Sequence, residues 1–543
     1  MNFKKRIKII LFTGILIINL ILRVPVASHE EGVDSFKVHV LAESISKYGY
    51  AKWIVHPASI IGFYPLSAPS GAPVFLSGIS QCSGLNMELA ILLHTMMLGI
   101  LGIFSVYLLA RELFQDDLFS FLSAFIFSVS PLFVAYTHWN ATTRGMFIAL
   151  LPFFIWGLLK TANTLKLKYL TLALLILALL TTVHRMFILI IPFIVLAFVF
   201  GILTVRFEIR GRPINTTYKA KLFAFVVLFI VIFAIQFIMG KGLQPPSEEY
   251  YQSSLFKGSS PAVILSNIAL NYATGITPLI ILLPFGLIAL FLKASKEGGA
   301  ERFLLITLLL AVLIISNKQY GRTFSMLFMV ILVAYSLTLI ARRVGKKTVC
   351  LLLILILAGN IAFTNWIYLY RRSASEETLR FEMSEHIHNL GIFIRDHCHE
   401  NTITLSDNEI IGLRVSATSE KSYEFPSGPT LLICGLVKKE QMRVEILSLA
   451  QFITNLREFW KLYDWIYPGT YYDGRHRFGL ERNSFDYYGI SIFKYYNFSY
   501  LIESGHPLYH FLLAKRIKTN ANKIYDNGFE KLWDMKNFLQ EIE

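Results

Sequence analysis

Apolar runs separated by short charged stretches dominate the first 370 residues of the chain. A helix needs about 20 mostly apolar residues to cross the hydrocarbon of a bilayer, and somewhat fewer when its charged flanks reach the interface. Eleven runs qualify, and they lie near 8–26, 86–110, 118–136, 145–159, 169–183, 187–205, 222–240, 276–293, 303–316, 324–341 and 348–370. The pattern predicts a polytopic α-helical membrane protein with about 11 transmembrane helices.

Basic residues in the connections predict how these helices are oriented, because Lys and Arg are retained on the cytoplasmic side. With the N-terminus inside, the inner connections hold 20 Lys and Arg in 57 residues, and the short outer connections hold 6 in 61. We therefore expect a multi-pass protein of the cell membrane with a cytoplasmic N-terminus. Residues 371–543 would be extracytoplasmic.

The first apolar run has a second interpretation. Four basic residues precede it, and it ends at Val26-Ala27-Ser28, as a cleaved signal peptide would. The run is long for a signal, which favours a retained helix. The other segments keep their orientation in either case.

Two large pieces fall on the predicted outer side. The first outer loop, 27–85, contains Ser35–Tyr48, in which apolar residues recur at the spacing of one helical face opposite charged residues, as in a helix lying in the membrane interface. The second piece, 371–543, alternates helical and strand patterns: helix 376–396, strand 402–405, strand 430–434, helix 444–462 and short strands at the end. The chain therefore divides into a transmembrane domain, 1–370, and a small C-terminal extracytoplasmic α/β domain, 371–543.

Composition and charge support this division. Hydrophobic residues make up 55% of the chain and charged residues 16%, well below the roughly 25% charge of soluble domains. Residues 371–543 hold 21 Lys and Arg against 23 Asp and Glu, so the basic excess belongs to the membrane part. There it serves topology and membrane lipids, and no nucleic-acid partner is predicted.

The spacing of the four cysteines matches no metal-binding motif. Cys398 and Cys434 share the predicted outer domain, where a disulfide and two buried thiols are equally compatible with the sequence. Two glycosylation sequons, at Asn140 and Asn497, also fall on this side, although such triplets are common by chance.

Ionisable and polar residues converge on the predicted outer side of the membrane. They are Glu30, Glu31 and Asp34 in the first loop, His138 and Arg144 in the second, His184 and Arg185 in the third, and Tyr320 and Arg322 before the last two spans. Each has an ordinary explanation: Asp34 could cap the following helix, the arginines could reach lipid phosphates, and the histidines could be interfacial. However, the outer side is otherwise poor in basic residues, so three arginines there require a cause beyond topology.

Together these groups suit transfer from a lipid-linked phosphate. A carboxylate can take a proton from an acceptor hydroxyl, and a guanidinium can stabilise the leaving phosphate. Motifs of P-loop proteins, zincins and α/β-hydrolases are missing from the sequence. The membrane runs also lack the buried acid pairs of a proton-coupled pump.

The order of these parts resembles the membrane glycosyltransferases of the C-type fold, in particular archaeal and bacterial groups related to dolichyl-phosphate-mannose–protein mannosyltransferases and aminoarabinose transferases. The motifs that carry the resemblance are Gly32-Val33-Asp34-Ser35-Phe36, Tyr64-Pro65 with Gly71 and Pro73, the stretch 105–147, the segments 179–184 and 320–324, and the turn 522–528. They extend over nearly the whole chain, but each is short and degenerate.

The resemblance implies a polyprenyl-phosphate sugar donor, such as a dolichyl-phosphate sugar, and inversion at the anomeric carbon. It makes Asp34 the catalytic base, Arg322 a candidate for the donor phosphate and Glu31 a weaker candidate at the acceptor. We also assign substrate-binding roles to His138, Arg144, His184, Arg185 and Tyr320. The acceptor, whether protein, lipid or glycan, is left open.

Two departures from the resemblance limit what it implies. The second outer loop has no acid, so no cofactor is assigned and a divalent metal is left open. The WWDYG signature of oligosaccharyltransferases is absent, and 465–469 only echoes it, which disfavours en bloc glycan transfer to asparagine. The competing hypothesis is a non-enzymatic transporter or assembly protein for lipid-linked glycans, which would tolerate asparagine at position 34.

Overall fold

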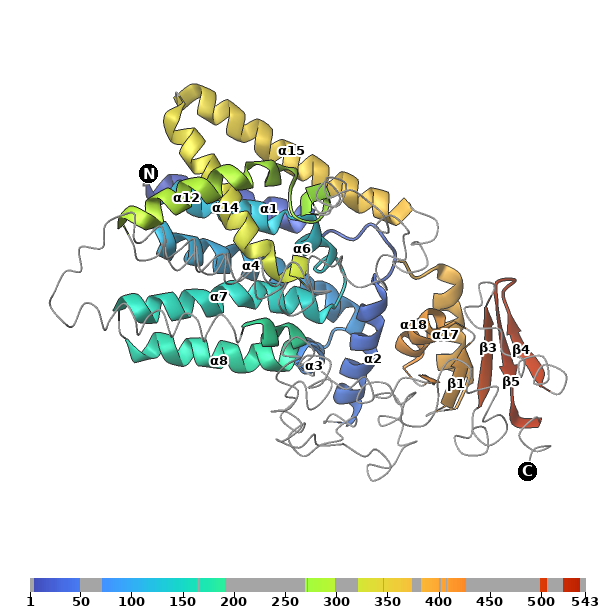
Figure 1. The fold of residues 1–543 in the computed structure, drawn as a ribbon. Coiled ribbons are helices and arrows are strands. Elements are labelled where there is room, and N and C mark those ends of the chain that lie inside the picture. The colour runs from blue at the N-terminus through green and yellow to red at the C-terminus, as the bar shows by residue number, and fades with distance from the viewer. Residues whose placement is uncertain are drawn as a thin grey trace, which may run out of the picture.

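The computed structural model describes residues 4–48, 71–164, 166–190, 269–270, 272–297, 321–344, 346–373, 382–399, 402–406, 408–420, 422–425, 499–504 and 521–537. The chain forms a helical bundle followed by a small C-terminal α/β part (Figure 1). The elements of the bundle and its loops are α1 (Lys5–Ile21), α2 (Val33–Tyr48), α3 (Gly71–Ser83), α4 (Met87–Phe114), α5 (Asp117–Ser128), α6 (Pro131–Ala135), α7 (Thr143–Thr164), α8 (Leu167–Val183), η2 (Arg185–Ile190), η3 (Pro278–Leu282), α12 (Leu283–Glu297), α14 (Gly321–Arg343) and α15 (Lys346–Ser373).

Helices α4, α5, α7 and α14 pack together as the centre of the bundle. Buried Phe, Leu and Ile side chains fill the space between them. Glycines allow close approach, because a Cβ at Gly99 would lie 2.4 Å from Asn19 Oδ1 of α1, and one at Gly102 would lie 2.7 Å from the Phe133 ring. Small residues at contacts are typical of packing between membrane helices.

The described residues contain three helices long and apolar enough to span a membrane, Met87–Phe114, Thr143–Thr161 and Arg322–Arg343. Shorter apolar helices cover Asp117–Ser128, Leu167–Val183, Pro278–Lys293 and Ile354–Tyr368. The predicted runs 222–240 and 303–316 lie outside the described residues, as does most of 187–205. The structure thus agrees with a multi-pass helical membrane protein, and the count of eleven stays a prediction.

One predicted span is divided in two. The run 118–136 forms α5 and then the short α6, because Pro131 has no backbone N–H to continue the helix and starts a new one. The break is buried, and Ser130 at it donates a hydrogen bond to the carbonyl of Gly275 at 3.2 Å. The chain after the break leads directly into the candidate site.

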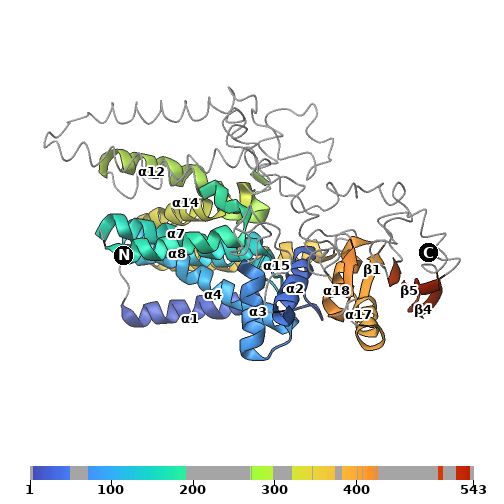
Figure 2. The ribbon, with the colours of Figure 1, turned by 90° about the horizontal axis from the view of Figure 1, so that it is seen from below.

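The two ends of the bundle differ in their chemistry. At the end with the N-terminus (Figure 2), ion pairs join α1, α5 and α14: Lys8 with Asp117 at 2.8 Å, and Arg342 with Asp116 at 2.5 Å. At the other end, the loop after α1 meets the start of α4, the segment 137–142 and the end of α15. This second end carries most of the predicted site residues.

Helix α2 occupies the position of the predicted interfacial helix. Val38, Leu41 and Ile45 are buried as the pattern predicts. Phe36 and Val40 are buried as well, because α3 and α4 contact α2 from the bundle and α18 contacts it from the C-terminal part (Figures 1 and 2). Helix α2 is therefore a packed connection between the two parts of the molecule.

In the described residues of the C-terminal part, a five-stranded mixed sheet packs with two helices. Its elements are α17 (Glu385–His397), β1 (Thr402–Ser406), α18 (Glu409–Ser419), β2 (Ser422–Phe425), β3 (Tyr500–Ser504), β4 (Asn522–Asp526) and β5 (Glu530–Asp534). The strand order is β2-β1-β3-β5-β4, with β1 parallel to β2 and β3, and the hairpin β4-β5 antiparallel. Gly528, at φ +89°, supplies the positive φ of this hairpin turn.

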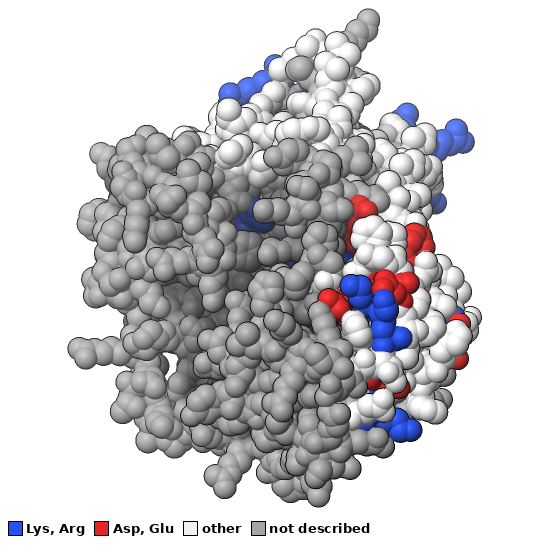
Figure 3. Space-filling view, turned by 90° about the vertical axis from the view of Figure 1, so that its right-hand side faces the viewer, with Lys and Arg blue, Asp and Glu red and all other residues white. Residues whose placement is uncertain are grey.

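Part of this topology matches the sequence prediction. Helix α17, strand β1 and the terminal hairpin lie where expected, whereas α18 and β2 were not predicted. The predicted strand 430–434, with Cys434, and the helix 444–462 lie outside the described residues, and Cys398 is buried. Figure 3 shows the side of the molecule on which the C-terminal part lies. On its described surface, acidic and basic side chains lie beside one another, in line with the near-neutral charge of residues 371–543.

Candidate active site

The loop after α1 and the first turn of α2 carry three carboxylates in five residues, Glu30 and Glu31 in the loop and Asp34 in the helix. Gly32 in its middle has φ +85°, and a Cβ there would lie 2.5 Å from Asn140 Nδ2. Only glycine adopts this conformation without steric cost. The turn at Gly32 separates two buried carboxylates from an exposed one.

Glu31 is buried in a cluster with residues far away in the chain. The Tyr368 hydroxyl, from the end of α15, lies 2.7 Å from both Glu31 carboxylate oxygens and 2.9 Å from His138 Nδ1. His138 Nε2 lies 3.2 Å from the carbonyl oxygen of Val24, and the Glu31 N–H donates to the carbonyl of Trp139 at 3.0 Å. We name Glu31, His138 and Tyr368 the tyrosine cluster. Its contacts connect the loop after α1 with the segment after α6 and with the end of α15.

Glu30 is buried in a second cluster. Its carboxylate pairs with His39 Nδ1 at 2.6 Å and accepts a hydrogen bond from Ser35 at 3.0 Å. Burial lowers the pKa of His39, but the charges and hydrogen bonds of Glu30 and then Glu43 outweigh it, and the pKa rises to about 10. The imidazole is therefore a cation at neutral pH.

A buried arginine from the C-terminal part completes the second cluster. The Arg414 guanidinium of α18 lies over the Phe36 ring at 5.3 Å, and its pKa falls to about 10 because burial removes it from water, while Glu30 acts in the opposite direction. Arg414 is fully buried. We name Glu30, His39 and Arg414 the buried charge cluster, because these charged groups are buried where α2 and α18 meet.

Asp34 differs from both glutamates. It lies in the first turn of α2, where the helix dipole favours a carboxylate, and its side chain is 54% exposed. Its described contact is an ion pair with Arg144 Nη2 at 3.2 Å. Of the three carboxylates, this one is open to an incoming group.

Arg144 connects Asp34 to the start of α14. Its guanidinium lies 5.5 Å from the centre of the Tyr136 ring, and the Tyr136 hydroxyl lies 3.4 Å from Thr323 Oγ1. Arg322 precedes Thr323 and packs its side chain against Gly275, where a Cβ would lie 3.1 Å from Arg322 Cδ. The structure thus brings the two arginines to the same end of the bundle as Asp34.

The remaining predicted residues are placed differently. His184 is buried at the end of α8, where its Nδ1 accepts a hydrogen bond from the N–H of Met186 at 3.0 Å and its ring meets Phe147. Arg185 begins η2, but its side chain lies outside the described residues, as does Tyr320. Among the predicted histidines and glutamates, His138, His184 and Glu31 are therefore packed into the protein.

Sequence reasoning missed several members of these clusters. Tyr368 looked like an ordinary residue of the last span, and His39 like a polar position of α2. Glu88 lies in the first turn of α4 and accepts a hydrogen bond from the N–H of Glu30, although its position predicts only a favourable helix dipole. These contacts join residues as much as 337 positions apart, and a single sequence carries no signal for such a pairing.

Comparison with known proteins identifies the class. Residues 67–236, just under a third of the chain, match the family model described as dolichyl-phosphate-mannose-protein mannosyltransferase. The oligosaccharyltransferase of Archaeoglobus fulgidus, tethered with an acceptor peptide containing the NVT sequon, matches with a TM-score of 0.60 at 12% identity over 92% of this chain and 69% of that one.

Two further solved structures are similar. The A. fulgidus enzyme AglB in complex with an inhibitory peptide and a dolichol-phosphate gives a TM-score of 0.55 at 12% identity, over 93% of this chain and 70% of that one. ArnT from Cupriavidus metallidurans in the apo state aligns over 98% of both chains at 12% identity with a TM-score of 0.44. No curated protein sequence matches the chain.

The chain is a multi-pass membrane protein with the C-type glycosyltransferase fold. Residues 67–236 match the model of the dolichyl-phosphate-mannose-protein mannosyltransferase family, and the class is a glycosyltransferase that uses a polyprenyl-phosphate-linked sugar. The class predicted from the sequence is confirmed.

Proposed function

We propose that the protein transfers a sugar from a polyprenyl phosphate to an acceptor hydroxyl at the extracytoplasmic face, with Asp34 as the base. The N-terminus is then cytoplasmic, and residues 371–543 form an extracytoplasmic domain beside the site. The excess of basic residues in the predicted inner connections supports this orientation.

The difference in exposure among the loop carboxylates carries the proposal. Glu30 and Glu31 are buried with hydrogen-bonding partners, whereas Asp34 is about half exposed beside a guanidinium. A base must reach the proton that it removes, and a carboxylate enclosed by His, Tyr and Ser cannot meet a new hydroxyl without breaking those bonds.

The reaction balances with these groups. The acceptor oxygen attacks the anomeric carbon as its proton passes to Asp34, and the bond from this carbon to the phosphate oxygen breaks with its electron pair on the leaving polyprenyl phosphate. Among the residues that the structure describes, Arg144 and Arg322 are cations at this end of the bundle that can stabilise the charge developing on the phosphate. Attack from the side opposite the leaving group gives inversion.

A metal at Asp34 does not fit its described surroundings. The side chain that meets the Asp34 carboxylate is the Arg144 guanidinium, which cannot be a ligand and would repel a cation. No step of the proposed reaction therefore passes through a metal at this carboxylate.

Sugar transfer by purified protein tests the assignment. Full-length protein in lipid nanodiscs is supplied with radiolabelled polyprenyl-phosphate sugars and candidate acceptors, and donor binding is measured separately. Removal of a general base lowers turnover by about 10²–10⁴-fold, so we expect Asp34→Asn to lose this much with donor binding kept. Asp396→Asn, a change at an exposed aspartate of α17, is the matched control.

Two results would contradict the proposal. Unchanged transfer in Asp34→Asn would mean that Asp34 is not the base and serves the start of α2. If turnover falls equally in Glu31→Gln and Asp34→Asn while both variants are folded, the loss of activity comes from a changed loop conformation and not from removal of the base.

A further inference from the structure

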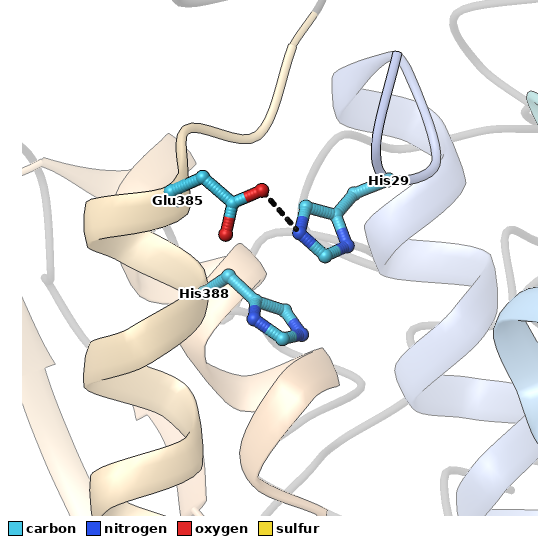
Figure 4. A group of neighbouring side chains, drawn as sticks. All are labelled: His29, Glu385 and His388. Carbon is cyan, nitrogen blue, oxygen red and sulfur yellow. Dashed lines mark ion pairs between the residues drawn. The ribbon is translucent and has the colours of Figure 1, made fainter.

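A second group of side chains lies at the contact between the bundle and the C-terminal part, outside the proposed reaction. His29 comes from the loop after α1, and Glu385 and His388 come from the first turn of α17 (Figure 4). Residues three apart on a helix share one face, so both α17 side chains point toward His29. One nitrogen or oxygen from each residue lies within 4.8 Å of the others.

A carboxylate behind His29 orients its ring. Glu88 Oε1 lies 3.2 Å from His29 Nδ1, while Nε2 faces Glu385 Oε1 at 3.6 Å. This Nε2 is buried and has no hydrogen-bond partner among the described residues. A histidine that donates one N–H to a carboxylate and points its other nitrogen at a shared point has the usual arrangement of a metal ligand.

From this arrangement we propose that His29, Glu385 and His388 bind a Zn²⁺ ion that ties α17 to the loop carrying Asp34. Two imidazoles and one carboxylate suit zinc, with bonds of about 2.0–2.2 Å and ligand atoms about 3.3 Å apart in a tetrahedral site. The two imidazole rings are stacked with centroids 3.9 Å apart, so binding of the ion requires side-chain rotation that turns the three ligand atoms toward one point. The fourth position is open to water.

The site is independent of the proposed reaction. Its three residues form none of the described contacts of Asp34 or Arg144, so zinc binding and sugar transfer can fail separately. Glu88 also accepts a hydrogen bond from the N–H of Glu30 at 2.9 Å. A bound ion would therefore hold the loop and α17 together next to the buried charge cluster.

The competing arrangement for the same residues has no metal. The pKa of His29 is raised by its hydrogen bond to Glu88 against the effect of burial, with help from Glu88 and Glu385 charges. A protonated His29 could bridge the two glutamates as a simple ion pair. Zinc and protons would compete for Nε2, so the two arrangements are separated by direct metal binding.

Zinc titration of the full-length protein tests the proposal. Protein in detergent is stripped with a chelator, Zn²⁺ is added against a competing fluorescent indicator, and bound metal is counted by elemental analysis. We expect one Zn²⁺ per chain in the wild type and at least a tenfold lower affinity in His29→Asn and in His388→Asn. Glu88→Gln should lower the affinity by about 10–100-fold, the usual effect of changing an outer-shell partner of a ligand.

Two controls use residues outside the cluster. His397→Asn removes an exposed histidine of the same helix, and Cys82→Ser removes an exposed thiol, so both should bind like the wild type. Thermal unfolding checks folding: Zn²⁺ should raise the midpoint of the wild type and the controls but not that of His388→Asn, whose midpoint without zinc should equal that of the wild type.

Two outcomes would overturn the proposal. Absence of stoichiometric zinc in the wild type would leave the ion-paired histidine as the structure of the cluster. Equal affinity in the wild type, His29→Asn and His388→Asn would place the bound zinc elsewhere in the chain.

Discussion

Glu31 and Asp34 lie three residues apart, yet their side chains are 7% and 54% exposed. Glu31 is enclosed by His138 and Tyr368, and its charge serves the structure of the loop. Asp34 begins a helix on the far side of a glycine turn and keeps its carboxylate accessible. One short acidic segment thus divides into a part that fixes the loop and a part suited to chemistry. Each change below tests one side of this division.

The largest expected effect on stability comes from Glu30→Ala. The change removes the carboxylate that pairs with the buried His39 at 2.6 Å and that favours the charge of Arg414, while Glu43 stays 3.7 Å from His39. Removing one partner of a buried ion pair costs about 3–5 kcal/mol. Chemical unfolding in mixed micelles would measure the loss. Asp396→Ala, at an exposed ion pair, should change nothing measurable, and an equal loss in both variants would contradict the buried charge cluster.

Raising the pH removes part of the same interaction. The pKa of His39 is raised from 6.5 to about 10 in the folded protein, so its stabilising charge is fully present below pH 6.5 and is lost as the pH rises toward 10. Glu30 and Glu43 both face this imidazole. We expect thermal midpoints to fall from pH 6.5 to 9.5, and to fall less in His39→Gln. A parallel decline in the two proteins would refute the assignment to His39.

Gly32→Ala should disturb both the buried Glu31 and the exposed Asp34. A non-glycine residue at φ +85° costs about 1–2 kcal/mol, and the new Cβ would also displace Asn140. Gly84 has φ +70° with nothing within 4 Å, so Gly84→Ala carries the backbone cost alone. We expect both a lower thermal midpoint and lower sugar transfer in Gly32→Ala than in Gly84→Ala, because only the first change displaces Asn140. Equal activity would mean that the turn does not position Asp34.

Tyr368→Phe makes the smallest structural change of the four, since it removes a single hydroxyl from the tyrosine cluster. The change removes one hydroxyl that donates to a carboxylate, a bond worth about 1.5–3 kcal/mol when buried. Unfolding measurements should show this loss, with donor binding unchanged. Tyr525→Phe, whose hydroxyl lies 3.5 Å from Asn527 in the terminal hairpin, should have little effect. Wild-type stability in Tyr368→Phe would remove the tyrosine cluster as a support of the loop.

The sequence predicted those features that depend on local pattern. Apolar runs located the long helices of the bundle but not α3, and the acidic motif at Gly32-Val33-Asp34 located the loop. Local pattern does not predict the break at Pro131 between α5 and α6 within one apolar run, and it missed the short β2 and α18. The burial of Glu31 and His138 depends on Tyr368 of α15, more than 200 residues further along the chain. Contacts of this kind arise from tertiary packing, which periodicity does not encode.

The tyrosine cluster also has a consequence for biosynthesis. It draws on the first loop, on the segment after α6 and on the end of α15, which leave the ribosome in that order. Asp34 therefore emerges early, but its loop receives its last hydrogen-bond donor only when the final helix of the bundle has been inserted. A nascent or truncated chain that lacks this helix would hold an incompletely supported loop, so the complete arrangement forms late in synthesis.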